Sequence, residues 1–136
     1  MRIVALDVGT KYIGIAITDE TQTIAQPYLT YRRKGLKKDL EFFGEFLEKH
    51  NVEKIVIGYP LFLDGTESKM SLYVKKFYNK MKQKFDLEII LWDERLSTEE
   101  TEEILNQFNR NLKKRKTLKD KIAAALILKD FLKNQS

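Results

Sequence analysis

The chain has 136 residues, of which 43% are hydrophobic and 33% are charged, a composition typical of one globular domain with its own core. It contains no cysteine and a single histidine, His50. The lack of cysteine excludes a disulfide framework, a thiolate metal site and a cysteine nucleophile. His50 falls at an expected helix C-terminus, where a cation is favourable, which indicates a structural role. Any catalysis must therefore use carboxylates, hydroxyls, lysines or a metal ion.

No apolar run is long enough to span a bilayer, and the first residues enter a strand directly, without a signal peptide. These features predict a cytoplasmic protein that makes no contact with membranes. The net charge of +5 favours a polyanionic partner. Two basic clusters favour nucleic acid, although each alone is also typical of a solvated loop. They are Arg32, Arg33, Lys34, Lys37 and Lys38, and Arg110, Lys113, Lys114, Arg115, Lys116, Lys119 and Lys121.

The first half of the chain predicts three strands and a helix. Within residues 3–19, two apolar runs flank a short Gly/Thr turn, which indicates two antiparallel strands. Residues 23–31 predict a third strand, and Pro27 favours an edge position for it. Apolar residues then recur at helical spacing and predict an amphipathic helix; they are Leu36, Leu40, Phe43 and Leu47.

The second half of the chain predicts alternating strands and helices. Residues 52–59 predict a buried strand, and residues 87–92 predict another. Between them lies a predicted helix with an apolar face of Met70, Val74, Phe77 and Met81. A helix is also expected to open at a capping box in residues 97–100, and a final helix is expected over residues 118–132.

This order of elements predicts an α/β fold, a single domain over residues 1–136 with a mixed five-stranded sheet flanked by helices. In such sheets, ligands bind beyond the carboxyl ends of the parallel strands. Asp7, Asp93 and Glu94 follow strand ends, and Asp120 falls in the first turn of the final helix. The sequence therefore predicts that carboxylates gather at one rim of the sheet.

Carboxylates without histidine suit oxygen-ligated ions such as Mg²⁺ or Mn²⁺, and a pair of such ions can hydrolyse a phosphodiester. Each acid also has a structural interpretation. Asp7 could cap its own turn, and the pattern Thr117-Leu118-Lys119-Asp120 is a capping box that would give Asp120 a role at a helix start. The residues alone leave both interpretations open.

Four ordered motifs make a family resemblance specific. They are Asp7-x-Gly9-Thr10-Lys11-x-Ile13-Gly14, Gly58-x-Pro60-Leu61 with Asp64-Gly65-Thr66, Asp93-Glu94-Arg95-Leu96-Ser97-Thr98, and Asp120-x-x-Ala123-Ala124. Together they cover nearly the whole chain, which resembles the YqgF or RuvX family of the ribonuclease H-like superfamily. The resemblance implies a cytoplasmic bacterial nuclease with a ribonuclease H-like fold. The family is assigned to 5′-end maturation of the 16S rRNA precursor, and an earlier proposal made it a resolvase of Holliday junctions.

By position, the resemblance implies that Asp7, Glu94 and Asp120 are catalytic and bind Mg²⁺ or Mn²⁺, with Asp93 as a further candidate ligand. Candidate substrate-binding residues are Gly9, Thr10, Lys11, Tyr12, Arg95, Arg115 and Lys116. Many relatives carry Arg where this chain has Tyr12. Tyr12 would then have to stack on the substrate, or Lys11 would have to replace the missing cation.

The favoured function is therefore a metal-dependent nuclease that acts on structured RNA, the 16S rRNA precursor. Cleavage of branched DNA is the nearest alternative, and it would require a homodimer because a symmetric junction needs two paired sites. The same Asp-x-Gly-Thr turn also occurs in two-lobed ATPases and sugar kinases, but 136 residues supply only one lobe. A non-catalytic RNA-binding factor is the remaining alternative. The sequence leaves open whether the protein is a monomer or a homodimer.

Overall fold

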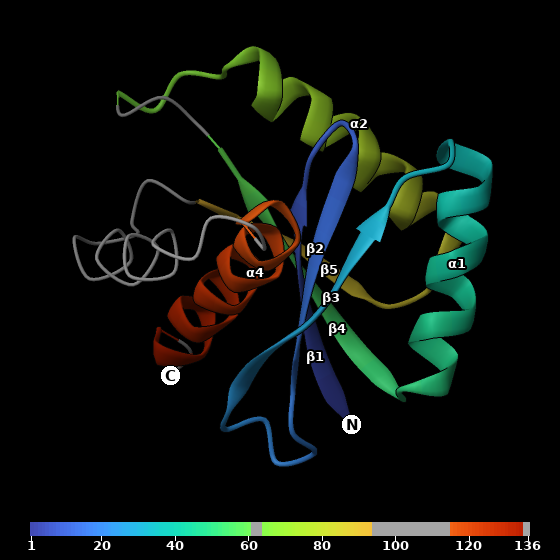
Figure 1. Cartoon of the computed structure of the whole chain (residues 1–136), viewed down its shortest axis with the longest axis vertical. Helices are drawn as coiled ribbons and strands as arrows, with labels where there is room; N and C mark the ends of the chain where they lie inside the picture. The colour runs from blue at the N-terminus through green and yellow to red at the C-terminus, as the bar shows by residue number, and fades with distance from the viewer. Residues whose placement is uncertain (61–63, 94–114, 135–136) are drawn as a thin grey trace.

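The computed structural model describes residues 1–60, 64–93 and 115–134, which form a sheet with helices on both faces (Figure 1). In chain order the elements are β1 (Arg2–Val8), β2 (Tyr12–Thr18), β3 (Ala25–Arg32), α1 (Leu36–Lys49), β4 (Val52–Tyr59), α2 (Lys69–Lys84), β5 (Glu88–Asp93) and α4 (Arg115–Lys133). The helix expected to open at residues 97–100 lies outside the described residues. None of the described helices has the length and apolar character needed to cross a bilayer.

The strands form one mixed sheet in the order β3-β2-β1-β4-β5. β1 and β2 are antiparallel, as are β2 and β3, whereas β1, β4 and β5 run parallel. This arrangement confirms the predicted mixed sheet. Pro27 lies in the edge strand β3, next to a shift in register, where a residue without an N–H group is tolerated.

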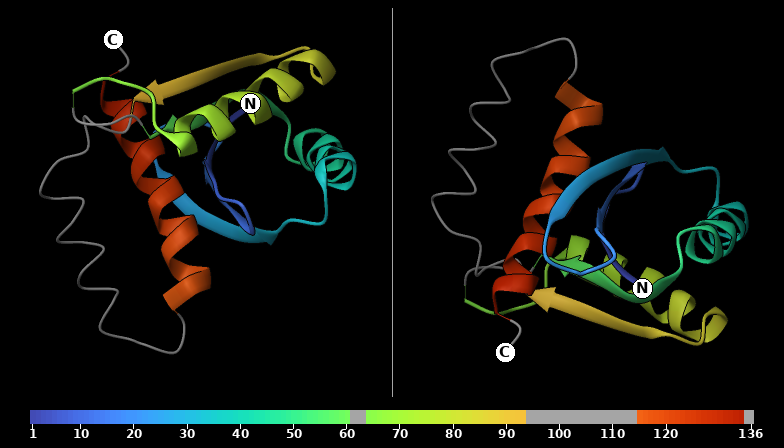
Figure 2. Two further views of the ribbon diagram at one scale, coloured as in Figure 1. Left: turned by 90° about the horizontal axis from the view of Figure 1, so that it is seen from above. Right: turned by 90° about the horizontal axis from the view of Figure 1, so that it is seen from below.

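The sheet separates two hydrophobic clusters. Figure 2 shows α1 and α2 on one side of the sheet and α4 on the other. Side chains along β1 alternate between these sides, since Val4 and Leu6 pack towards α1 and α2 while Ile3 and Ala5 pack towards α4. By the same alternation, Asp7 at the end of β1 faces α4.

Helix α4 begins earlier than the sequence indicated. It runs from Arg115, so Arg115 and Lys116 form its first turn and Asp120 is its sixth residue. The expectation that Asp120 lies in the first turn was therefore wrong, and the Thr117 pattern does not mark the start of the helix. Arginine and lysine are good helix formers, and no Gly or Pro interrupts this stretch, which explains the longer helix.

α4 lies directly against the sheet at Gly14 of β2. A Cβ atom placed on Gly14 would lie only 1.9 Å from the carbonyl oxygen of Asp120 and 2.8 Å from the nitrogen of Lys121. Both of these atoms belong to the helix backbone, so no side chain could move aside to make room. The fully buried Ala124 also lets α4 lie close to the sheet, because its side chain is small.

We expect Gly14→Ala to lower the free energy of unfolding by about 3 kcal/mol, because the added methyl group must push α4 away from β2. Urea denaturation would measure this change, and amide hydrogen exchange in α4 would show whether the loss is concentrated there.

Gly44→Ala in α1 is a matched control. A Cβ at Gly44 would meet only Phe85, at an ordinary 3.5 Å, and alanine favours a helix by about 0.5–1 kcal/mol over glycine. We therefore expect the control to be as stable as the natural chain or more so. A Gly14→Ala protein of unchanged stability would contradict the close contact.

Candidate functional site

Asp7 lies where β1 reaches the rim of the sheet. It pairs directly with Gly14 across the antiparallel β1–β2 ladder, so both residues lie on the same face. The backbone of Asp120 contacts that glycine. Asp7 and Asp120, which are 113 positions apart in the sequence, are therefore brought together by the packing of α4 on β2.

The environment of Asp7 opposes its ionisation. The pKa of its carboxyl is raised to about 6, mainly by burial and then by the negative charge of Asp120, against a lowering effect of Lys119. Burial also raises the pKa of Asp120, again against Lys119. Within the described part of the chain, no hydrogen bond or ion pair satisfies the Asp7 carboxylate.

Asp7 does not close the turn that follows it. The Gly9 N–H donates to the carbonyl oxygen of Tyr12 at 2.8 Å, so the turn is closed by the backbone. A carboxylate that is partly buried, has a raised pKa and is not used by its own turn is typical of a functional site. The interpretation of Asp7 as a turn cap is therefore not supported.

Asp93 reaches the same rim from β5 but by alternation lies on the opposite face. Trp92 packs towards α4, where its Nε1 donates to Asp130 at 2.8 Å, whereas Leu91 packs towards α1 and α2. Asp93 follows Trp92, so the alternation of the strand places it on the side away from Asp7. Glu94, the next residue, lies outside the described residues.

The candidate substrate-binding residues are only partly described. Thr10 and Lys11 are exposed in the turn after Asp7, and Tyr12 is half-buried at the start of β2. Arg95 lies outside the described residues, as do the side chains of Arg115 and Lys116. The residues that the structure brings to one place are thus Asp7, Asp120 and the turn from Gly9 to Tyr12.

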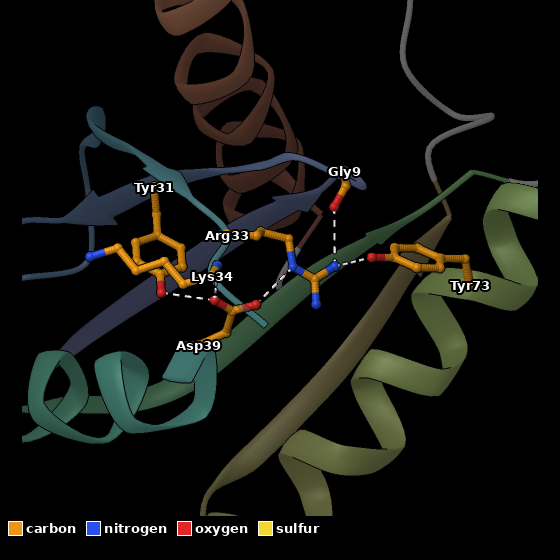
Figure 3. A network of polar contacts seen from close by, with 6 residues as sticks. All are labelled: Gly9, Tyr31, Arg33, Lys34, Asp39 and Tyr73. Carbon is orange, nitrogen blue, oxygen red and sulfur yellow. Dashed lines mark hydrogen bonds and ion pairs between the residues drawn. The ribbon is translucent and has the colours of Figure 1, made fainter. Parts of the chain in front are cut away.

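Arg33 was expected in a solvated or nucleic-acid-binding cluster, but its side chain is only 11% exposed. Its Nε donates to Asp39 at 2.9 Å, and the Asp39 side chain is fully buried. Its Nη1 donates to the carbonyl oxygen of Gly9 at 3.2 Å and to the hydroxyl of Tyr73 (Figure 3). Arg33 therefore ties the turn after Asp7 to α1 and α2.

Asp39 is a buried acid whose oxygens are well satisfied. Besides Arg33, the Tyr31 hydroxyl donates to it at 2.8 Å and the Lys34 N–H at 2.9 Å (Figure 3). Burial alone would raise the pKa of Asp39, but these hydrogen bonds and the guanidinium outweigh it and hold the pKa below its usual value. One signal in the sequence pointed to this role, since Asp39 falls on the apolar face of its helix, one turn before Phe43.

We expect Arg33→Met to lower the free energy of unfolding by about 3 kcal/mol at neutral pH, because it leaves the Asp39 carboxylate buried without a cation. Adding Asp39→Asn should restore part of the loss in the double variant. Urea denaturation would measure the free energy of unfolding of the single and the double variant. The loss should shrink as the pH falls, because a carboxylate with a lowered pKa stabilises the fold only while it is ionised. A single variant as stable as the natural chain would contradict a structural role for the pair.

We expect Asp7→Asn to stabilise the metal-free protein at pH 7.5. A carboxyl whose pKa is raised on folding binds its proton more tightly in the folded state, so its ionisation destabilises the fold as the pH rises from about 4 through 6. Since one pKa unit corresponds to about 1.4 kcal/mol, the gain should be roughly 2–3 kcal/mol at pH 7.5 and should vanish near pH 4. An equal difference at both pH values would show that ionisation of Asp7 is not its cause.

Comparisons with known proteins agree with this architecture. The sequence model of the family described as "RuvX: Holliday junction resolvase" matches residues 1–134. A protein of Syntrophomonas wolfei named "Putative pre-16S rRNA nuclease" is 42% identical over 132 residues, which cover 97% of this chain and 94% of the relative. A protein of the same name from Thermoanaerobacter pseudethanolicus is 41% identical over 136 residues, 99% of this chain and 98% of the relative.

Two solved structures share the fold at low sequence identity. RuvC of T. thermophilus, in complex with a Holliday junction substrate, is similar with a TM-score of 0.61 and 12% identity, over 97% of this chain and 93% of that one. The resolvase of Fowlpox virus, also in complex with Holliday junction DNA, is similar with a TM-score of 0.60 and 13% identity, over 98% of this chain and 97% of that one. These similarities confirm the predicted ribonuclease H-like fold. With the family match over nearly its whole length, this chain belongs to the RuvX family.

Proposed function

We propose that this chain is a nuclease that hydrolyses phosphodiester bonds during maturation of the 16S rRNA precursor in the cytoplasm. The observation that carries the proposal is the meeting of Asp7 and Asp120 at the rim of the sheet. Their burial and mutual repulsion are unfavourable for the fold alone, which points to a chemical role. The names of the full-length relatives supply the substrate.

The donor set fits a hard divalent cation. Asp7 and Asp120 offer only carboxylate oxygens, the ligands that Mg²⁺ and Mn²⁺ prefer. Within the described residues, no group of three His, Cys, Asp or Glu side chains could hold an ion. We propose Glu94 as the third ligand, because the alternation of β5 puts Asp93 on the face away from Asp7. Such an ion would activate water and offset the negative charge that develops on the leaving oxygen.

The remaining residues would position the substrate. Lys11 and Thr10 are exposed in the turn next to Asp7, where an ammonium and a hydroxyl can contact a phosphate. Arg115 and Lys116 belong to the first turn of α4, about one turn before Asp120, and we propose them as contacts for the RNA backbone. Tyr12 begins β2 at the same turn and offers a ring for stacking. Because the pKa of Asp7 is raised in the metal-free protein, a proton competes with the ion for this carboxylate, so we expect cleavage to need more of the ion as the pH falls below about 6.

The test is cleavage of a 16S rRNA precursor fragment by the full chain with Mg²⁺, with Mn²⁺ and with EDTA. We expect cleavage that requires the ion and that falls at least about 100-fold in Asp7→Asn. Unfolding would not explain that loss, because Asp7→Asn is expected to be more stable than the natural chain at neutral pH. If both proteins bind the RNA equally and neither cleaves it, the protein is a binding factor rather than a nuclease.

Cleavage of branched DNA is the second candidate, favoured by the description of the family model. A four-way DNA junction belongs in the same experiment for this reason. Junction cleavage needs two sites related by symmetry, so it predicts a homodimer in sedimentation experiments, whereas RNA trimming requires only a monomer. Cleavage of the junction without cleavage of the RNA would replace the first proposal with this one.

A further inference from the structure

A groove lies between the start of α1 and the outer surface of α2. Its volume is about 340 Å³, at the lower end of the range of roughly 300–1,000 Å³ that is usual for ligand pockets. Its apolar lining comes from Leu36, Tyr73 and Phe77, and its charged lining from Arg33, Lys76 and Lys80. The groove is on the face of the sheet opposite α4.

The walls of the groove are strongly basic. α2 has six lysines and no acidic residue, the lysines being Lys69, Lys75, Lys76, Lys80, Lys82 and Lys84. Lys34, Lys37 and Lys38 do not line the groove, but they are exposed in the same stretch of chain as its lining residues Arg33 and Leu36. The neighbouring Asp39 is buried and already paired with Arg33. Among the described residues, neither Lys76 nor Lys80 takes part in an ion pair. The charge of the groove is therefore free to attract an anionic partner.

The groove begins beside the candidate site. The guanidinium of Arg33 lies 5.4 Å from the centre of the Tyr73 ring and 5.2 Å from that of Phe77, so it forms one end of the groove. The same guanidinium donates to the carbonyl oxygen of Gly9, in the turn that follows Asp7. One side chain thus separates the groove from the turn at the site.

We infer that this groove binds an unpaired segment of the RNA that flanks the bond to be cleaved. Apolar and aromatic side chains bordered by lysines are the usual platform for single strands. Phe77 is only 3% exposed and forms the floor of the groove, so a base would contact Leu36 and Tyr73 at the surface, while phosphates would meet Lys76 and Lys80. The volume accommodates a single base, and a paired base inside a duplex could not enter it. The inference rests on the proposed function and extends it to the form of the substrate.

The test compares two RNA hairpins, one blunt and one with unpaired tails at both ends, bound to full-length protein carrying Asp7→Asn so that neither is cut. Fluorescence anisotropy measures the dissociation constants. We expect Lys76→Glu with Lys80→Glu to weaken binding of the tailed hairpin about tenfold or more and to change binding of the blunt hairpin little. Replacing the same lysines by Gln should reduce the salt dependence by about 1.4 in log–log slope, since two phosphate contacts are lost.

The matched control is Lys129→Glu with Lys133→Glu. These lysines are also exposed and four positions apart, but they lie on α4, on the opposite face of the sheet. All four lysines are exposed, so both double variants should fold, which circular dichroism would verify. We expect the control pair to leave binding of the tailed hairpin within about twofold of its starting value.

Equal losses in the groove variant and the control variant would overturn the inference, because they would show a general effect of charge. Equal losses for tailed and blunt hairpins would overturn it too. So would a tailed hairpin that binds the Asp7→Asn protein no more tightly than the blunt hairpin. The cleavage experiment on the natural chain is separate. If the groove variant loses binding of the tail selectively and the natural chain cleaves no RNA, the groove would be supported as an RNA-binding site and the proposed nuclease activity would be rejected.

Discussion

The contact between α4 and Gly14 is the constraint on which the candidate site depends. Asp7 and Asp120 come from opposite ends of the chain, and they meet only because the helix backbone can lie directly on β2. A Cβ at Gly14 would occupy the position of the Asp120 carbonyl group. Because that glycine is the direct pairing partner of Asp7, the point of closest packing is also the point where the two carboxylates approach each other.

The fully buried Asp39 and the partly buried Asp7 show how the surroundings of a carboxylate decide whether it serves the fold or a reaction. Asp39 accepts hydrogen bonds from Arg33, Tyr31 and Lys34, and its pKa is lowered, so its charge holds the fold together. Asp7 receives no such donor from the described residues, and its pKa is raised. A partly buried carboxylate without partners weakens the native state, which fits a position where an ion or substrate supplies the missing contacts.

Much of this arrangement follows from the sequence, because strand alternation and the order of elements are local patterns. They predicted the mixed sheet, the edge position of Pro27 and the placement of Asp7 at a strand end. Two features depend on contacts between distant segments and could not be predicted from such patterns. The role of Gly14 requires knowing where α4 packs, and the burial of Arg33 requires knowing that α2 covers it.

The candidate site and the groove lie on opposite faces of the sheet, so a single RNA strand that contacts both must cross the rim of the sheet. The crossing point is the turn from Gly9 to Tyr12, where Thr10 and Lys11 are exposed. Arg33 donates a hydrogen bond to the Gly9 carbonyl oxygen of this turn, and its side chain also lines one end of the groove. The turn therefore lies between the carboxylates of the candidate site and the lysines of α2, and Arg33 holds it there. The same guanidinium therefore couples the packing of α1 and α2 to the position of the turn beside Asp7.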